Sequence, residues 1–382
     1  MKDFVEVRPL RWSATSLLAA GLALAACGDG GGSAGADPTG DMGQPGEPDG
    51  AGGTPDGGGG EVGGAGGVPG GAGGAGGVPG GSGGAGGMGG AGGELPPVED
   101  PEVRSVASAI SGVKSSAPSP DGTSVYFTGY GDEAGTVYHV GEMAGEPTIV
   151  SATFVLPMDL ITSMDGDTLF VADVGYENEV GQDGVIYRVA SAGGVPEAMG
   201  TTAGYDARGL DLVVEQGEEV LYFSGKDPIT GAAGVFKSNA AGGVVTVVAT
   251  GADFADPSGI AVTAGGDVFV ADTVATGRSG LYRVTAGAAE RLEIPYALGY
   301  PAGLALSQDG GTLFISAQNT GTGNATVVTY DLADGLFAER ANDVIGANLE
   351  AGGLHRGQDS SRFSWCGTDD AGAGSVFLLI GQ

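Results

Sequence analysis

The sequence has little positive charge. Its 382 residues include 15 Lys and Arg against 47 Asp and Glu, which gives a formal net charge of −32 at pH 7. From Val98 onward there are 12 basic and 37 acidic side chains, so this part alone carries a formal charge of −25. A surface of this sign argues against nucleic acid or anionic lipid as a partner, and favours cations or basic surfaces.

Cysteine is also scarce, and a long hydrophobic run is missing. The two cysteines are Cys27 and Cys366. The apolar run Ser13–Ala26 follows the basic residues Lys2, Arg8 and Arg11, and it is too short to span a bilayer, so it is typical of an export signal.

The end of this apolar run identifies an anchor. Leu24-Ala25-Ala26-Cys27 resembles the lipobox of bacterial lipoproteins, in which cleavage precedes a cysteine that receives the lipid. The resemblance implies a signal peptide over 1–26, a mature chain that begins at Cys27, and export to the outer membrane or cell surface of a bacterium. A plain secretory signal with a chance cysteine is the alternative. Lipid on Cys27 excludes an internal disulfide, and we expect Cys366 to be a small buried residue.

A glycine-rich segment follows. Of the 70 residues from Gly28 to Pro97, 35 are glycine, eight are acidic and none is basic. Such a segment cannot bury enough apolar surface to offset its ordering entropy. We therefore predict a disordered tether over 27–97 and a folded domain over 98–382, ample for one core.

The folded part repeats one pattern. In Pro257–Val284 a buried strand, a tight turn, an alternating second strand, a longer loop and a third strand follow one another. The pattern recurs six times at steps of 44 or 50 residues, with a fourth strand behind most copies. This period, without helical periodicity, predicts an all-β fold, a six-bladed β-propeller. The equivalent inner-strand positions are Ser116, Leu160, Leu210, Ile260, Leu304 and Leu354.

The last copy ends after its third strand, which would leave an open sheet edge. The segment Val103–Ala107 precedes the first inner strand and has no blade of its own. We predict that it pairs with Val376–Leu379 and closes the ring.

Pro257–Val284 also resembles an NHL-type repeat. The matching positions are Pro257, Gly259–Val262, Val268–Asp272 and Arg278. The wider superfamily of six-bladed propellers, which includes gluconolactonase and regucalcin-like enzymes, is similar to residues 101–382. The resemblance implies the fold more strongly than an activity, because one propeller supports many functions.

Loop lengths indicate which face would bind a ligand. The turns between first and second strands are tight, whereas the links from second to third strand and between blades are long, and propeller connectivity places both long sets on one face. Binding residues concentrate in long loops on a rigid scaffold. Aromatic residues before the inner strands could form a stacking platform there or pack one blade against the next; they are Phe154, Tyr205, Phe254, Tyr296 and Tyr300.

Oxygen-bearing side chains also gather near the predicted pore mouth, where hard ligands from several blades could hold calcium. The resemblance to gluconolactonases implies a divalent ion at this place, although Ser258 and Ala302 stand where an amide is expected. The candidate ligands are Asp159, Asp173, Asp272, Asn319, Asn348 and Glu350. Asp173 and Asp272 could instead accept backbone N–H bonds in the following loop.

Other chemistry is sparse. No HExxH, paired CxxC or phosphate loop occurs in the folded part. His355 has no serine or cysteine nucleophile in an identifiable elbow, so we expect a core or pore-lining histidine. One acidic cluster lacks the spacing of an EF-hand, so we expect a solvated acidic loop there. It contains Glu177, Asn178, Glu179 and Asp183.

These observations predict a monomeric, lipid-anchored propeller that binds a protein, peptide or glycan through its long-loop face, with no catalytic residue assigned. The alternative is a calcium-dependent lactonase or esterase of the gluconolactonase type. A surface spacer is a third reading.

Overall fold

The computed structural model describes residues 102–131, 134–175, 183–273, 280–341, 348–369 and 373–381. All described residues belong to one compact unit, Gly90–Gln382. The expected signal peptide, Cys27 and the whole tether lie outside them, as do Arg278 and the acidic loop around Glu177. Within these ranges, no helix combines the length and the apolar character needed to cross a membrane.

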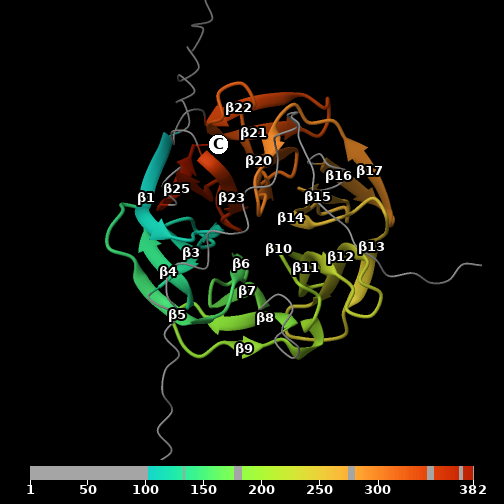
Figure 1. Ribbon diagram of the computed structural model, residues 1–382, viewed down its shortest axis with the longest axis horizontal. Coiled ribbons are helices and arrows are strands. Elements are labelled where there is room, and N and C mark those ends of the chain that lie inside the picture. Colours follow the sequence, from blue (N-terminus) through green and yellow to red (C-terminus); the bar gives the residue numbers. More distant parts are fainter. Residues whose placement is uncertain are drawn as a thin grey trace, which may run out of the picture. The chain divides into compact units, whose positions relative to one another are not determined.

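Six antiparallel sheets form a ring around a central axis (Figure 1). The first blade contains β2 (Ser116–Pro118), β3 (Ser124–Tyr130), β4 (Gly135–Gly141) and β5 (Thr148–Phe154). The second contains β6 (Pro157–Thr162), β7 (Thr168–Gly175), β8 (Asp183–Ala190) and β9 (Glu197–Ala198), followed by the 3₁₀ turn η1 (Gly200–Thr202). The third contains β10 (Gly209–Glu215), β11 (Glu218–Lys226), β12 (Ala233–Asn239) and β13 (Thr246–Thr250).

The remaining three blades complete the ring. The fourth contains β14 (Pro257–Val262), β15 (Val268–Asp272), β16 (Gly280–Thr285) and β17 (Ala288–Leu292). The fifth contains β18 (Ala297–Leu298), β19 (Leu304–Leu306), β20 (Thr312–Gln318), β21 (Ala325–Asp331) and β22 (Phe337–Ala341). The sixth contains β23 (Asn348–Arg356), β24 (Phe363–Asp369), β25 (Ala373–Ile380) and β1 (Glu102–Ser111). The predicted six-bladed β-propeller is therefore confirmed.

The fourth blade shows how the repeated sequence produces the sheet. Every residue of β14 and β15 is buried, since both strands lie between neighbouring blades. Gly266, in the turn that joins them, has φ of +87°, a conformation that favours glycine. The outer strand β17 begins at Ala288 because Thr285 pairs with Ala288 across a tight hairpin.

The predicted closing strand is confirmed in register. In β1, Val103 pairs with Leu379 and Ala107 pairs with Val376 of β25. Figure 1 shows β1 on the outside of β25, as the fourth strand of the sixth blade. Two register shifts lie between Ser105 and Ile110, and such bulges make an edge strand a poorer template for pairing with other chains.

Hydrophobic clusters join adjacent blades. One contains Ile161 and Phe170 of the second blade together with Leu210 and Phe223 of the third. Apolar burial of this kind is the main favourable term in folding. It holds the inner strands rigidly around the axis, where the candidate site lies.

Candidate functional site at the axis of the ring

The two faces of the ring differ. On the short-turn face, hairpins such as 263–267 join first to second strands, and third-to-fourth hairpins are short as well. On the long-loop face lie the blade-to-blade links and the second-to-third loops, such as 227–232 and 319–324. The inner strands run between these faces, so their first residues surround the pore mouth of the long-loop face.

A hydrogen-bonded group of Asp159, His355 and Ser115, which we name the polar plug, joins the inner edges of neighbouring blades. The Nε2 atom of His355 lies 2.8 Å from Oδ1 of Asp159, and the Ser115 hydroxyl donates to the same oxygen. The backbone N–H groups of Leu160 and Leu210 also donate to this carboxylate, at 2.9 and 2.7 Å. Its partners come from four blades, and Asp159 is only 4% exposed. The plug therefore ties the first, second, third and sixth blades together.

The charge state of the plug follows from its surroundings. Burial opposes the charged form of His355, but the Asp159 carboxylate and its hydrogen bond outweigh burial and raise the pKa of His355 above its ordinary value. The expectation of a core or pore-lining histidine is confirmed, because His355 is 5% exposed.

A second carboxylate, that of Asp211, lies near the plug. It accepts hydrogen bonds from the backbone N–H groups of Leu212 at 2.8 Å and Val262 at 2.6 Å. Burial raises its pKa to about 6, against the opposing effects of these bonds and of the charges on His355 and Arg356. The sequence analysis did not select Asp211, although a lone carboxylate in the apolar strand GLDLVV was the available signal.

At the pore mouth, three side chains from three successive blades meet. Arg208 precedes β10, Asp256 precedes β14, and Tyr300 lies in the link before β19. Nε of Arg208 is 3.2 Å from Oδ1 of Asp256, and its Cζ lies 5.6 Å from the centre of the Tyr300 ring. We name these three residues the mouth cluster; of them, only Tyr300 was a predicted site residue.

Two of the predicted metal ligands hold the blade-to-blade links. Asp173 accepts backbone N–H bonds from Val155 and Leu156, each at 2.8 Å, and from Gly175 at 3.0 Å. Asp272 similarly accepts from residues 255 and 256, at 2.6 and 3.1 Å. The backbone-accepting role is confirmed, but its donors are mostly in the preceding link, because the second strand ends beside the chain entering the inner strand.

The other candidate ligands lie elsewhere. Asn319 is in the β20–β21 loop, where its Oδ1 accepts from Gly321 at 2.9 Å and its Nδ2 donates to Glu339 at 3.0 Å. Asn348 and Glu350 lie in β23, and their side chains are outside the described part. Among the described side chains, no group of three or more His, Cys, Asp and Glu residues could hold a metal ion. The described carboxylates near the axis thus have protein donors rather than a shared ligand position.

The five predicted aromatic residues do not all face the same environment. Phe154 is 3% exposed and packs edge-on against Tyr187 of the next blade, and Phe254, in the link before β14, is 7% exposed and packs edge-on against Tyr282 of the fourth blade. These two rings have the packing role that the sequence left open. Tyr205, Tyr296 and Tyr300 keep partly exposed surface, although Tyr205 also packs against Phe223 and Phe236.

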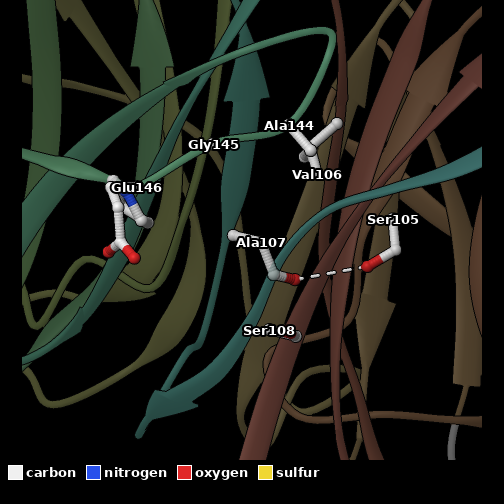
Figure 2. Close-up of a pocket in the computed structure, with 8 residues that line it drawn as sticks. Ser105, Val106, Ala107, Ser108, Ala144, Gly145 and Glu146 are labelled. Atoms are coloured by element: carbon white, nitrogen blue, oxygen red, sulfur yellow. Dashed lines mark hydrogen bonds between the residues drawn. The ribbon is translucent and has the colours of Figure 1, made fainter.

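A polar hollow of about 250 Å³ lies away from the axis, on the rim. Figure 2 shows one wall formed by β1 and the other by the turn that carries Glu146. The Ser105 hydroxyl donates back to the Ala107 carbonyl at 3.5 Å, so the groups in this hollow partly serve the bulged strand itself.

Cys366 lies in β24 and is fully buried. A methyl group added to Gly352 would come within 2.3 Å of its sulfur. The prediction of a small buried residue is confirmed.

Comparisons with known proteins support the fold. No protein-family model matches the sequence, and no curated protein matches it. Similar solved structures include a gluconolactonase from Xanthomonas campestris, with 15% identity, a TM-score of 0.51, and coverage of 74% of this chain and 91% of that chain. Another is the PQQ-bound aldose sugar dehydrogenase from Streptomyces coelicolor, with 13% identity, a TM-score of 0.51, and coverage of 75% and 99%. Since likeness at this identity shows the fold alone, the chain is a six-bladed β-propeller.

Proposed function

We propose that this protein is a lipid-anchored, extracytoplasmic binding module whose long-loop face takes a protein, peptide or glycan ligand. The observation that carries the proposal is the difference between the two faces. Long loops and a partly exposed polar and aromatic cluster surround one end of the axis, whereas tight hairpins surround the other. A rigid scaffold that presents variable loops on one side is typical of binding proteins.

The proposed location at the membrane is based on the sequence that precedes the propeller. The lipobox-like Leu24–Cys27 supports lipid attachment, and two or more acyl chains give durable anchoring where one does not. The glycine-rich tether would keep the propeller away from the membrane surface. Replacement Cys27→Ser is expected to release the protein from the membrane fraction of the producing cells, and retention there would contradict the proposed anchor.

The geometry does not favour the calcium-dependent lactonase. Asp159, Asp173 and Asp272 already accept hydrogen bonds from protein donors. Those bonds would have to be replaced before the carboxylates could serve as calcium ligands. We therefore assign no reaction to the site.

Two exposed residues of the third blade provide a matched test of the proposed face. Ile229 lies in the β11–β12 loop on the long-loop face and is 92% exposed, and Val244 lies in the β12–β13 turn on the short-turn face and is 83% exposed. Full-length protein would be applied to peptide and glycan arrays. Ile229→Asp is expected to weaken the binding of the strongest array ligands, and Val244→Asp to leave it unchanged. The opposite pattern, or equal losses, would contradict the proposal.

A further inference from the structure

Arg208 is an unusual cation in this acidic protein. It is 8% exposed, yet it belongs to the inner strand region at the pore mouth. It contacts Tyr300, which comes from the blade two steps further round the ring. The guanidinium therefore lies between blades rather than within one blade.

The Arg208 guanidinium has N–H donors without acceptors among the described residues. Arginine carries five N–H donors. Nε of Arg208 is within ion-pair distance of Asp256, but it is not aligned for a hydrogen bond. No oxygen of the described residues accepts a hydrogen bond from its Nη atoms. The buried Nε atom also lacks a hydrogen-bond acceptor, and a buried donor without an acceptor calls for a ligand or ordered water.

Arg356 shows what a structural arginine looks like in the same molecule. Its Nε donates to the Leu306 carbonyl at 2.9 Å, and Nη1 donates to the carbonyls of Gly357, Gln358 and Ser360 at 2.7 to 2.9 Å. That side chain joins the fifth and sixth blades through its hydrogen bonds. Arg208 forms none of this kind, so its position is not explained by the fold.

The surroundings of Arg208 suit a carboxylate. Two Nη atoms present parallel N–H bonds that match the two oxygens of a carboxylate. Asp256, held by the bond from its backbone N–H to Asp272, supplies an acceptor beside them. Tyr300 supplies a partly exposed ring. An anion that carries an N–H donor next to its carboxylate would contact both charged side chains.

We propose that the mouth cluster binds the C-terminal carboxylate of a peptide, with the last peptide N–H donated to Asp256. The inference rests on the proposed function, since it places the ligand on the long-loop face. The folded part carries a formal charge of −25, which repels a polyanion more strongly than a chain end with a single carboxylate.

The test compares a peptide acid with its amide. Fluorescein-labelled tetra-alanine with a free C-terminus and its C-terminal amide would be titrated with full-length protein and followed by fluorescence anisotropy. We expect the acid to bind at least about tenfold more tightly than the amide. Arg208→Gln is expected to abolish this preference, and Arg208→Lys to retain part of it, because lysine keeps the charge but not the paired donors.

Arg283→Gln is the matched control. Arg283 lies on β16, bound to Asp267, so its replacement removes the same charge away from the mouth cluster and should leave peptide binding unchanged. Thermal melting would show whether each variant is folded. If Arg208→Gln is not folded, Arg208→Lys is compared with the wild type instead.

Any of four outcomes would overturn the inference. The acid and the amide could bind alike, or Arg208→Gln could bind the acid as well as the wild type does. Phenyl β-glucuronide could bind in an Arg208-dependent way while the peptide does not, which would assign the cluster to an acidic glycan. If no probe binds but Ile229→Asp still weakens array binding, this inference fails and the proposed face stands.

Discussion

Two groups of buried charges lie along the axis of the ring, and they differ in how their hydrogen bonds are met. In the plug, the Asp159 carboxylate has four donors from four blades. In the mouth cluster, the Arg208 guanidinium has one imperfectly aligned carboxylate and one aromatic ring. Both are buried, so burial alone does not distinguish a structural role from a binding role.

The difference teaches that hydrogen-bond completeness separates the two roles. A fully hydrogen-bonded polar group specifies a unique arrangement of the strands, and removal of one partner lowers the free energy of unfolding. An incompletely bonded group has donors or acceptors without protein partners, and a ligand can form hydrogen bonds with them. If this is correct, replacements in the plug should affect stability, and replacements in the mouth cluster should affect binding.

The largest effect is expected from Asp159→Ala. The change leaves His355 and two backbone N–H groups buried without their acceptor, so the free energy of unfolding should fall by about 3–5 kcal/mol. For a domain of this size the melting temperature should fall by roughly 10 °C. Thermal melting followed by circular dichroism measures it. Asp167→Ala, an exposed carboxylate in the same blade, is the control, and a similar loss in both variants would remove the distinction.

A smaller effect concerns pH. Because the pKa of His355 is raised on folding, its stabilising contribution is fully present below the unfolded pKa of about 6.5 and is lost as pH rises through the folded value. The wild type should therefore lose stability between pH 6.5 and the folded pKa, by at most about 1.4 kcal/mol per pH unit. Urea unfolding of wild type and His355→Gln checks it.

Other charged groups lie near the His355 imidazole, so the pH range of the measurement must separate their titration from that of His355. These groups are Asp159, Asp211 and Arg356. The pKa of Asp211 is raised to about 6, so its effect on stability falls mainly between pH 4 and 6 and is separable. Equal slopes above pH 6.5 in wild type and His355→Gln would show that the plug does not titrate as described.

Arg208→Gln should change stability little. The replacement breaks an ion pair whose Asp256 side chain is 20% exposed, and it removes no hydrogen bond to a described residue. Water can reach the Asp256 carboxylate that remains, so the free energy of unfolding should change by only about 1 kcal/mol, less than in Asp159→Ala. Urea unfolding beside Asp159→Ala gives the comparison directly. A loss as large as that of Asp159→Ala would make Arg208 a structural residue.

The smallest effect is expected from calcium. Saturating calcium added to chelator-treated protein should change the melting temperature by less than about 1 °C, because the described axial carboxylates already have protein donors. Thermal melting with and without calcium measures this, with magnesium as the control ion. A rise of several degrees specific to calcium would restore the lactonase alternative.

The architecture was predictable because it depends on local patterns that repeat. The strand and turn signals around Pro257–Val284 recur at nearly constant spacing, and a period of this length leaves few alternatives to a propeller. The pairing of Val103–Ala107 with the last strand followed from the missing outer strand, since an open edge is unfavourable.

The contacts at the axis were not predictable in the same way. Asp159 and His355 are 196 residues apart, and they meet because the ring closes. Asp159 was selected as an oxygen donor, but its histidine partner was not recognised. Arg208 and Asp256 were missed because nothing in one repeat shows which side chains from neighbouring blades converge at the pore mouth.

The pairing of β1 with β25 makes the ring independent of where the polypeptide is cut. Glu102 lies directly opposite Ile380, so a short linker could join these positions while new ends are opened in a hairpin of the short-turn face. Each such circular permutant would keep every strand pair and move the seam to another blade. The fold therefore depends on the order of the blades around the ring, and the natural positions of the chain ends are one of several that are compatible with it.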